Sequence, residues 1–134
     1  MLAIIYLLSM VAAEPMSPAQ ADAAIYYVRT AAHQFSMEWF CDTGQEDAVR
    51  ERTISRLSAK VTPKQVDLLM GEFDRELSRL GYRVGDTPAN REKARRAVMS
   101  HGASCDRTLL ANLKARDEKR LEYIDHPQRM SEKE

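Results

Sequence analysis

The chain has 134 residues, of which 30% are charged and 44% hydrophobic, and its 20 basic and 20 acidic side chains give a net charge of zero. This composition is typical of one globular domain and not of a disordered chain. A net charge of zero gives no overall bias toward nucleic acid or another highly charged partner. We therefore expect a single domain whose function depends on local patterns.

The first residues are typical of a secretion signal. Leu2 to Ala13 is an unbroken run of apolar or small residues, too short to span a bilayer but suitable for the apolar part of a signal peptide. No Lys or Arg precedes it, so the positive charge would come from the α-amino group or from residues upstream of Met1. The alternative is an N-terminal helix that packs on the core.

Two small-x-small sequences could be the cleavage site, Ala19-Gln20-Ala21 and Val11-Ala12-Ala13. We prefer the first, because the usual signal is longer than thirteen residues. The sequence therefore predicts a signal peptide over residues 1–21 and a single helical domain over 22–125. The protein would be periplasmic or secreted, with no stable membrane span after cleavage.

Cys41 and Cys105 are the only cysteines. In an oxidising compartment an isolated pair is most simply a disulfide. The chain-entropy relation gives about 4 kcal/mol of stabilisation for a loop of about 65 residues. The two thiols are too far apart for a CxxC redox motif, and a zinc site would need further ligands.

Residues 23–41 predict the helix around which the domain is built. Ile25, Val28, Ala32, Phe35 and Trp39 share one stripe. A second stripe holds Tyr26, Thr30, His33 and Met37, with Phe40 and Cys41 at its end. The polar edges between the stripes are narrow, with Arg29 and Ser36 on one side and Gln34 and Glu38 on the other. A helix that is apolar on two faces needs a covering layer on each, from the same chain or from a homodimer.

Four more helices follow in the sequence. Capping boxes at Thr43–Glu46 and Thr62–Gln65 predict helices to about residue 60 and to Gly81. Thr87-Pro88 starts the next, and Ser104 caps the last. We expect these inward-facing side chains: Val49, Ile54, Leu57, Val66, Leu69, Met70, Phe73, Leu77, Leu80, Ala94, Ala97, Val98, Leu109, Leu110, Leu113, Leu121, Tyr123 and Ile124. Residues 126–134 have no pattern and are expected to be a flexible tail. The fold class is all-α, a compact bundle of about five helices with one disulfide, Cys41–Cys105.

The sequence Val61-Thr62-Pro63-Lys64-Gln65 resembles the L-T-x-x-Q motif of a family of periplasmic stress chaperones. The match covers five residues, begins with Val in place of Leu, and has no second copy in the chain. A capping box with Pro at the first helical position accounts for the same residues. The chaperone function is therefore not transferred on this basis.

No catalytic motif is present in the sequence. His33, Met37 and Cys41 share one side of a helix, as copper ligands would, but a disulfide removes the Cys41 thiolate. A hydrolase would need a base such as His33 or His101 beside a nucleophile, or Glu38 in a perturbed setting, and no G-x-S-x-G, H-E-x-x-H or glycine-rich phosphate loop occurs. We therefore predict a protein that is not an enzyme and that needs no metal or cofactor.

The densest basic cluster is formed by Arg91, Lys93, Arg95 and Arg96, and Arg107, Lys114 and Arg116 could extend it. No aromatic residue is interleaved for base stacking, and an exported protein meets little nucleic acid. These side chains are our predicted contact to an acidic protein partner or an anionic envelope component. The expected function is a small exported binding protein, such as an inhibitor or immunity-type protein. The alternatives are an envelope-stress chaperone with an apolar cradle, or an enzyme with a pocket containing His33 or His101.

Overall fold

A computed structural model of the chain describes residues 16–83, 85–100 and 102–133, with side chains to Met130. The apolar run of the predicted signal peptide and His101 lie outside these ranges. The described part is all-α, as predicted, and contains no strand. Its helices are α2 (Pro18–Phe40), α3 (Glu46–Ser58), α4 (Pro63–Arg79), α5 (Pro88–Met99), α6 (Arg107–Asp125) and the short α7 (Gln128–Lys133).

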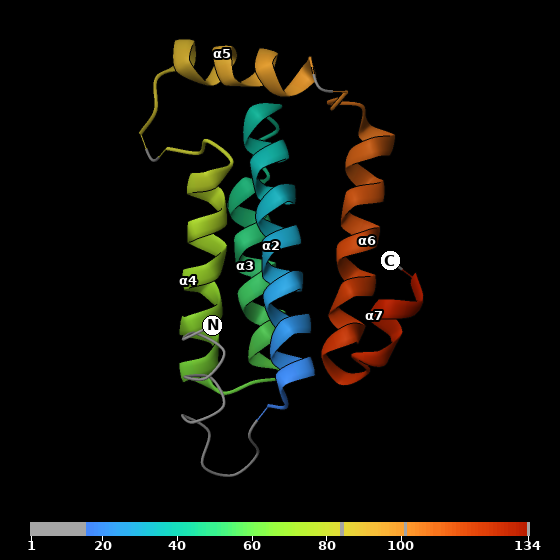
Figure 1. Ribbon diagram of the computed structural model, residues 1–134. Coiled ribbons are helices and arrows are strands. Elements are labelled where there is room, and N and C mark those ends of the chain that lie inside the picture. Colours follow the sequence, from blue (N-terminus) through green and yellow to red (C-terminus); the bar gives the residue numbers. More distant parts are fainter. Residues whose placement is uncertain (1–15, 84, 101, 134) are drawn as a thin grey trace.

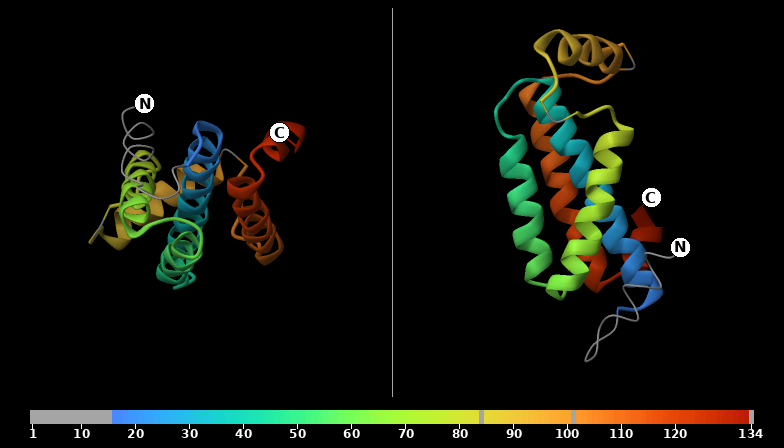
Figure 2. Two further views of the ribbon diagram at one scale, coloured as in Figure 1. Left: turned by 90° about the horizontal axis from the view of Figure 1, so that it is seen from below. Right: turned by 90° about the vertical axis from the view of Figure 1, so that its left-hand side faces the viewer.

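Helix α2 is the centre of the bundle. It packs against α3, α4, α5 and α6. Helices α4 and α6 lie on opposite sides of it (Figure 1). The chain ascends in α2 and descends in α6, so these two neighbours are antiparallel (Figure 1). Helix α5 lies across one end of the bundle, roughly perpendicular to the other helices (Figure 2). The central position predicted for this helix is therefore confirmed.

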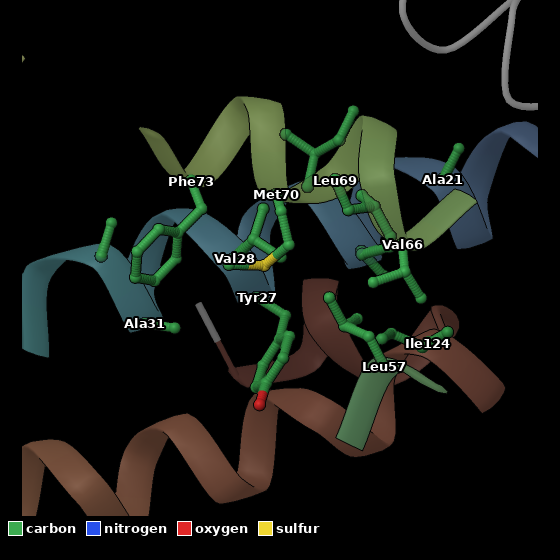
Figure 3. Packing of buried hydrophobic residues seen from close by; sticks show 14 of the residues in the cluster. Ala21, Tyr27, Val28, Ala31, Leu57, Val66, Leu69, Met70, Phe73 and Ile124 are labelled. Atoms are coloured by element: carbon green, nitrogen blue, oxygen red, sulfur yellow. The ribbon is translucent and has the colours of Figure 1, made fainter. Parts of the chain in front are cut away.

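The apolar face of α4 forms one half of the core. Val66, Leu69, Met70 and Phe73 point from α4 toward α2, where Val28 meets them (Figure 3). The capping box that starts this helix has formed, since Gln65 N–H donates to Thr62 Oγ1 at 3.3 Å and Thr62 N–H donates to Gln65 Oε1 at 2.9 Å. Two reciprocal bonds and Pro63 at the first helical position hold the start of α4 in place.

The start of α2 lies earlier in the chain than predicted. Ser17 is its N-cap, in a capping box with Gln20, and Pro18 is the first helical residue. Met16 and Ala21 are both buried in the core. The helix therefore runs without a break across the predicted cleavage site between Ala21 and Asp22.

The two-stripe description of α2 is only half right. The first stripe, Ile25 to Trp39, is buried as predicted. The polar edge residues Gln34, Ser36 and Glu38 are also buried, whereas His33 of the second stripe is exposed. The reason is that α3, α4 and α6 surround α2 on three sides, so the edges are covered and part of the second stripe faces the open side between α4 and α6.

The predicted capping box at Thr43 is wrong. Helix α3 begins at Glu46 after Gln45, which makes no side-chain cap. Asp42 has a positive φ of 54°, and the resulting turn brings Thr43 back onto α2. There the Thr43 hydroxyl contacts the carboxylate and the carbonyl oxygen of Glu38, and it accepts a hydrogen bond from the N–H of Gln45 at 3.2 Å and not from that of Glu46, as the predicted capping box requires.

The later helices differ from the predictions at several positions. Helix α5 has no fully buried residue: Ala94 and Val98 are half-buried and Ala97 is exposed. The N-cap of α6 is Asp106, not Ser104. Leu109, which was expected inside, is 46% exposed. Residues 128–133 form the short helix α7, where no regular structure was expected.

The disulfide between Cys41 and Cys105 is present, with the Cα atoms 5.5 Å apart. Cys41 caps the C-terminal end of α2 and Cys105 lies just before α6, so the bond joins the ends of these two helices through cysteines that are 64 residues apart in the chain. An aromatic cluster lies at the same end, where the Tyr82 ring stands at 4.9 Å from Trp39 and 5.0 Å from Phe35. This end of α2 is thus fixed by both a covalent bond and aromatic packing.

Candidate binding surface

Arg91 of the predicted basic cluster is held inside the chain. Its guanidinium carbon lies 5.0 Å from the centroid of the Trp39 ring, and its Nη1 donates to Asp42 Oδ1 at 3.0 Å. A cation–π contact and an ion pair together attach α5 to the end of α2. This position accounts for Arg91 without a partner.

Arg95 and Arg96 share one carboxylate, that of Glu92 on the preceding turn of α5. The hydrogen bond from Arg95 lowers the pKa of the Glu92 carboxyl, so the acid is ionised and offsets part of the basic charge. Of the four predicted contact residues, only Lys93 has no ion pair within the described ranges. The α5 cluster is therefore much less available to a partner than its sequence suggests.

A second set of cations lies on α6. Four of its basic side chains are exposed and make no ion pair in the described part of the chain: Arg107, Lys114, Arg116 and Lys119. We call these four residues together the α6 basic face, although at 100° per residue Arg116 and Lys119 share one side of the helix and Arg107 and Lys114 lie toward another. The sequence indicated Arg107, Lys114 and Arg116 as a possible extension of the basic cluster, but it did not indicate Lys119.

The acidic residues of α6 do not neutralise this face. Glu118 pairs with Arg52 and Arg56 of α3, and Asp125 pairs with Lys60. Glu122 lies 3.9 Å from Arg129. The fourth acid, Asp117, is buried at 4% exposure. The acids of α6 are therefore paired or buried within the described part of the chain, whereas the four cations of the α6 basic face are exposed and unpaired.

Beside the α6 basic face is a groove of about 330 Å³ between α2, α6 and the segment that precedes α6. Its lining is formed by His33, Met37, Gly102, Ala103, Ser104, Leu109, Asn112, Leu113 and Arg116. We call it the α2–α6 groove. Leu109 on its wall is the large hydrophobic side chain that is most exposed among the described residues. The groove thus combines an apolar lining with a cation from the α6 basic face.

His33 faces the open side of α2, between α4 and α6. Its Nε2 lies 3.1 Å from Glu76 Oε2, and Glu76 also accepts two hydrogen bonds from Arg79. The bonds from Arg79 lower the pKa of the Glu76 carboxyl, so this acid is an ionised structural partner for both residues. The Cys41 sulfur beside His33 and Met37 is in the disulfide, so it is not available as a metal ligand. No group of three metal-ligating side chains occurs within the described ranges.

Asp117 is the buried carboxyl of the α2–α6 interface. It accepts a hydrogen bond from Thr30 Oγ1 at 3.0 Å, and burial raises its pKa to about 6 despite the nearby Arg52, Arg120 and Arg56. Burial, together with the charge of Asp117, raises the pKa of Tyr27 to about 12. The acid is thus half-protonated near pH 6, and it has no access to a ligand.

A larger cavity of about 440 Å³ lies between α3 and α4. Its lining includes Phe35, Tyr82 and the ion pair between Arg50 and Asp74, whose atoms are 2.6 Å apart. Its charges are therefore mixed and partly satisfied within the chain. Because it presents no single sign of charge, it selects no class of partner.

Comparisons of the chain with protein-family models, with curated proteins and with solved structures found no match. Within the described residues, no helix has both the length and the apolar composition needed to cross a bilayer. The assignment of function therefore depends on the surface of this chain.

The helical period explains why Leu109, which was predicted to face inward, is exposed, and why Lys119, which was not a candidate, lies near it. Leu110, Asp117 and Ile124 are seven residues apart and all buried, which fixes the inner face of this helix. Leu109, Asn112, Arg116 and Lys119 then lie together on the outer side. The seven-residue spacing of the inner face is visible in the sequence. It could be recognised there only by assuming that Asp117, which lies in a charged stretch, is buried.

Proposed function

We propose that this protein is a small exported binding protein that attaches to an acidic protein partner through the α6 basic face. It acts without catalysis, as an inhibitor or immunity-type protein would. The observation that carries the proposal is the set of four exposed basic side chains on α6 that have no ion pair in the described part of a chain whose net charge is zero.

The export proposal is supported by two independent features. The apolar run Leu2 to Ala13 fits a signal peptide, and the Cys41–Cys105 bond is of the kind that persists in oxidising compartments. A disulfide that closes a loop of this length contributes about 4 kcal/mol by the chain-entropy relation. A domain that depends on such a bond suits the periplasm or the cell exterior.

Electrostatic attachment is supported by the difference between α5 and α6. A charge that is already paired gains little from a new partner, because the first pair must be broken. Arg91, Arg95 and Arg96 are paired within the chain, whereas the α6 basic face is not. The binding surface that the sequence placed on α5 is therefore better assigned to α6.

An apolar cradle of the kind that chaperones use finds less support. Leu109 is the one large hydrophobic side chain recorded as exposed in the described ranges, and a client-binding surface needs a contiguous apolar patch of several hundred Å². A dedicated partner with one anchoring contact fits this surface better than a range of unfolded clients.

The test is a pull-down from envelope extract with the full, oxidised chain at low and high salt. We would compare wild type with the double variant Arg116→Glu/Lys119→Glu and with Lys93→Glu. Lys93 is a matched control, since it is also an exposed cation without an ion pair, but lies on α5. We expect one stoichiometric partner that is lost at high salt and with the α6 double variant, and retained with Lys93→Glu.

Loss of the partner with Lys93→Glu but not with the α6 variant would return the binding surface to α5. A salt-insensitive collection of partly unfolded proteins would favour the chaperone alternative. If neither is captured, the binding proposal fails.

A further inference from the structure

We propose that the α2–α6 groove seats an apolar anchor side chain from an acidic amphipathic helix of the partner, with Leu109 and Leu113 as its wall and Arg116 at its rim. This assignment presupposes the binding function proposed above and names the partner's chemistry. The partner segment would place one row of apolar side chains in the groove and acidic side chains toward α6.

Leu109 gives the groove an exposed apolar side chain. It is 46% exposed on a helix whose next residue, Leu110, is buried in the core. Leu109 lines the groove together with Met37 and Leu113, which are both half-buried. A partner side chain that enters the groove would remove apolar surface of all three from water, and this is the main favourable term in helix–groove association.

Two cations of α6, Arg116 and Lys119, lie on the same side of the helix as Leu109. At 100° per residue, Leu109, Asn112, Arg116 and Lys119 fall within an arc of about 80° on α6. The anchor site and two unpaired cations are therefore side by side on one helix face. An acidic partner is preferred because each of its carboxylates near the rim meets a cation that has no competing ion pair in the described chain.

The acids of α4 that lie near His33 are paired within the chain, and the exposed Asp106 before α6 accepts a hydrogen bond from the N–H of Thr108. Glu76 is paired with His33 and Arg79, and Glu72 is paired with Arg29 and Arg75. Asp117, on the neighbouring face of α6, is buried. The lining of the groove thus contains no acidic side chain, and Arg116 is the one Lys or Arg within it.

The shape distinguishes a protein helix from an anionic lipid surface. Helices α2 and α6 are antiparallel (Figure 1), and both contribute side chains to the lining of the α2–α6 groove. A groove between two helices can receive the apolar ridge of a third, as in helix-in-groove complexes. A bilayer surface favours a convex apolar face whose side chains project beyond the charged ones. Met37 and Leu113 lie in the groove and are only half-exposed, so a flat lipid surface does not reach them.

The probe is a synthetic helix of about 18 residues with leucines spaced i, i+4 and i+7 on one face and glutamates on the other. A fluorescent label reports its binding to the full oxidised protein by anisotropy at low and moderate salt. A second peptide has alanine in place of each leucine and the same charge. Vesicles that contain phosphatidylglycerol serve as the lipid probe.

We expect the leucine peptide to bind at least about tenfold more tightly than the alanine peptide, since anchors in a groove dominate such interfaces. Leu109→Asp and Leu109→Ala should each weaken it about tenfold or more, and Arg116→Glu should weaken it and reduce its salt dependence. Lys93→Glu should leave it unchanged. Circular dichroism and the Tm show whether each variant is folded, and Leu109→Ala keeps the helix even if Leu109→Asp does not.

Equal binding of the two peptides, or binding unaffected by both Leu109 variants, would overturn the groove assignment. Vesicle binding that is abolished by Leu109→Asp would overturn it in favour of a lipid surface. A partner captured from extract that needs Arg116 and Lys119 but tolerates Leu109→Asp would refute this inference alone and leave the proposed function standing.

Discussion

Asp117 makes the bundle less stable as the pH rises, which is the opposite of the usual effect of a carboxyl group. Burial raises the pKa of this carboxyl from 3.8 to about 6 in the folded chain. Between these two values the folded chain binds more protons than the unfolded chain, so the free energy of unfolding falls as the pH rises. Below the lower value both states are protonated, and the full stability contribution is present.

The magnitude follows from the difference between about 6 and 3.8. This difference is about 2.2, and 1.36 kcal/mol for each unit of pKa gives about 3 kcal/mol lost between about pH 3 and pH 7. Asp117 is 4% exposed, so little of this is screened by solvent. Domains of this size are stable by about 5–15 kcal/mol, and the loss is a substantial share of that margin.

Asp117→Asn is the informative variant, because its amide is neutral at every pH. We expect the unfolding free energy of the variant to be flatter, so that its difference from wild type changes by up to about 3 kcal/mol in its favour from about pH 3 to pH 7. Urea unfolding of the oxidised proteins at a series of pH values measures this difference. Asp67→Asn, at an exposed position of α4, is the control.

The test compares the unfolding free energies of wild type and Asp117→Asn at each pH, because other groups also change the stability of both proteins with pH. Glu76 acts in the opposite direction, because the hydrogen bond from Arg79 lowers its pKa and its contribution is lost as the pH falls below about 4.5. That loss is common to both proteins and cancels. A constant difference between wild type and Asp117→Asn across the range would refute the reasoning, and so would a difference that moves in favour of wild type.

Three further perturbations test the fold. Cys41→Ser should lower the free energy of unfolding by about 4 kcal/mol and the Tm by about 10–20 °C with unchanged helix content at low temperature, and a Tm equal to wild type would contradict the stapling role. A chain that starts at Asp22 lacks the Ser17 capping box and buried Met16, so it should be about 2–4 kcal/mol less stable than one that starts at Glu14, and equal urea midpoints would argue against this. Thr62→Ala should cost about 1 kcal/mol by loss of the α4 cap, whereas an unchanged midpoint would show that the cap is dispensable.

The truncation also bears on export. A signal cleaved between Ala21 and Asp22 would remove the first turn of α2, whereas cleavage after Ala13 would keep Met16 and Ser17. The second site in the sequence therefore preserves more of the folded structure. Mass spectrometry of the exported chain distinguishes the two, and we expect the N-terminus at Glu14.

The sequence predicted α4 best because its signals all agree. Thr62 and Gln65 form a capping box, Pro63 suits the first turn, and the apolar spacing is regular up to Leu77. Such local signals depend only on residues that are close in the chain, so they survive in the folded protein. Thr43 had the same local pattern, but a buried Glu38 competed for its hydroxyl, and no local rule reveals that contact.

The candidate site was less predictable because charges pair through space. The sequence shows that Arg91 and Arg95 lie in a basic run, but it does not show that Trp39 and Asp42 lie beneath one of them. Likewise, Lys119 is distinguished only once Glu118 and Asp125 are paired with other helices. Local density of charge predicts where cations occur, and only the fold determines which remain available.

The disulfide also decides how force passes through the molecule. A partner that pulls on α6 near its N-terminal end applies tension at Cys105, and the shortest covalent path from there to the central helix is the single bond to Cys41. Helices α3, α4 and α5 lie within the ring that this bond closes, so the shortest covalent path of that tension does not run through their backbone while the bond is intact. A protease that cuts once between α4 and α5 would likewise release no fragment. In the oxidised bundle, α5, which has no fully buried residue, therefore lies outside the shortest covalent path of a pull on α6.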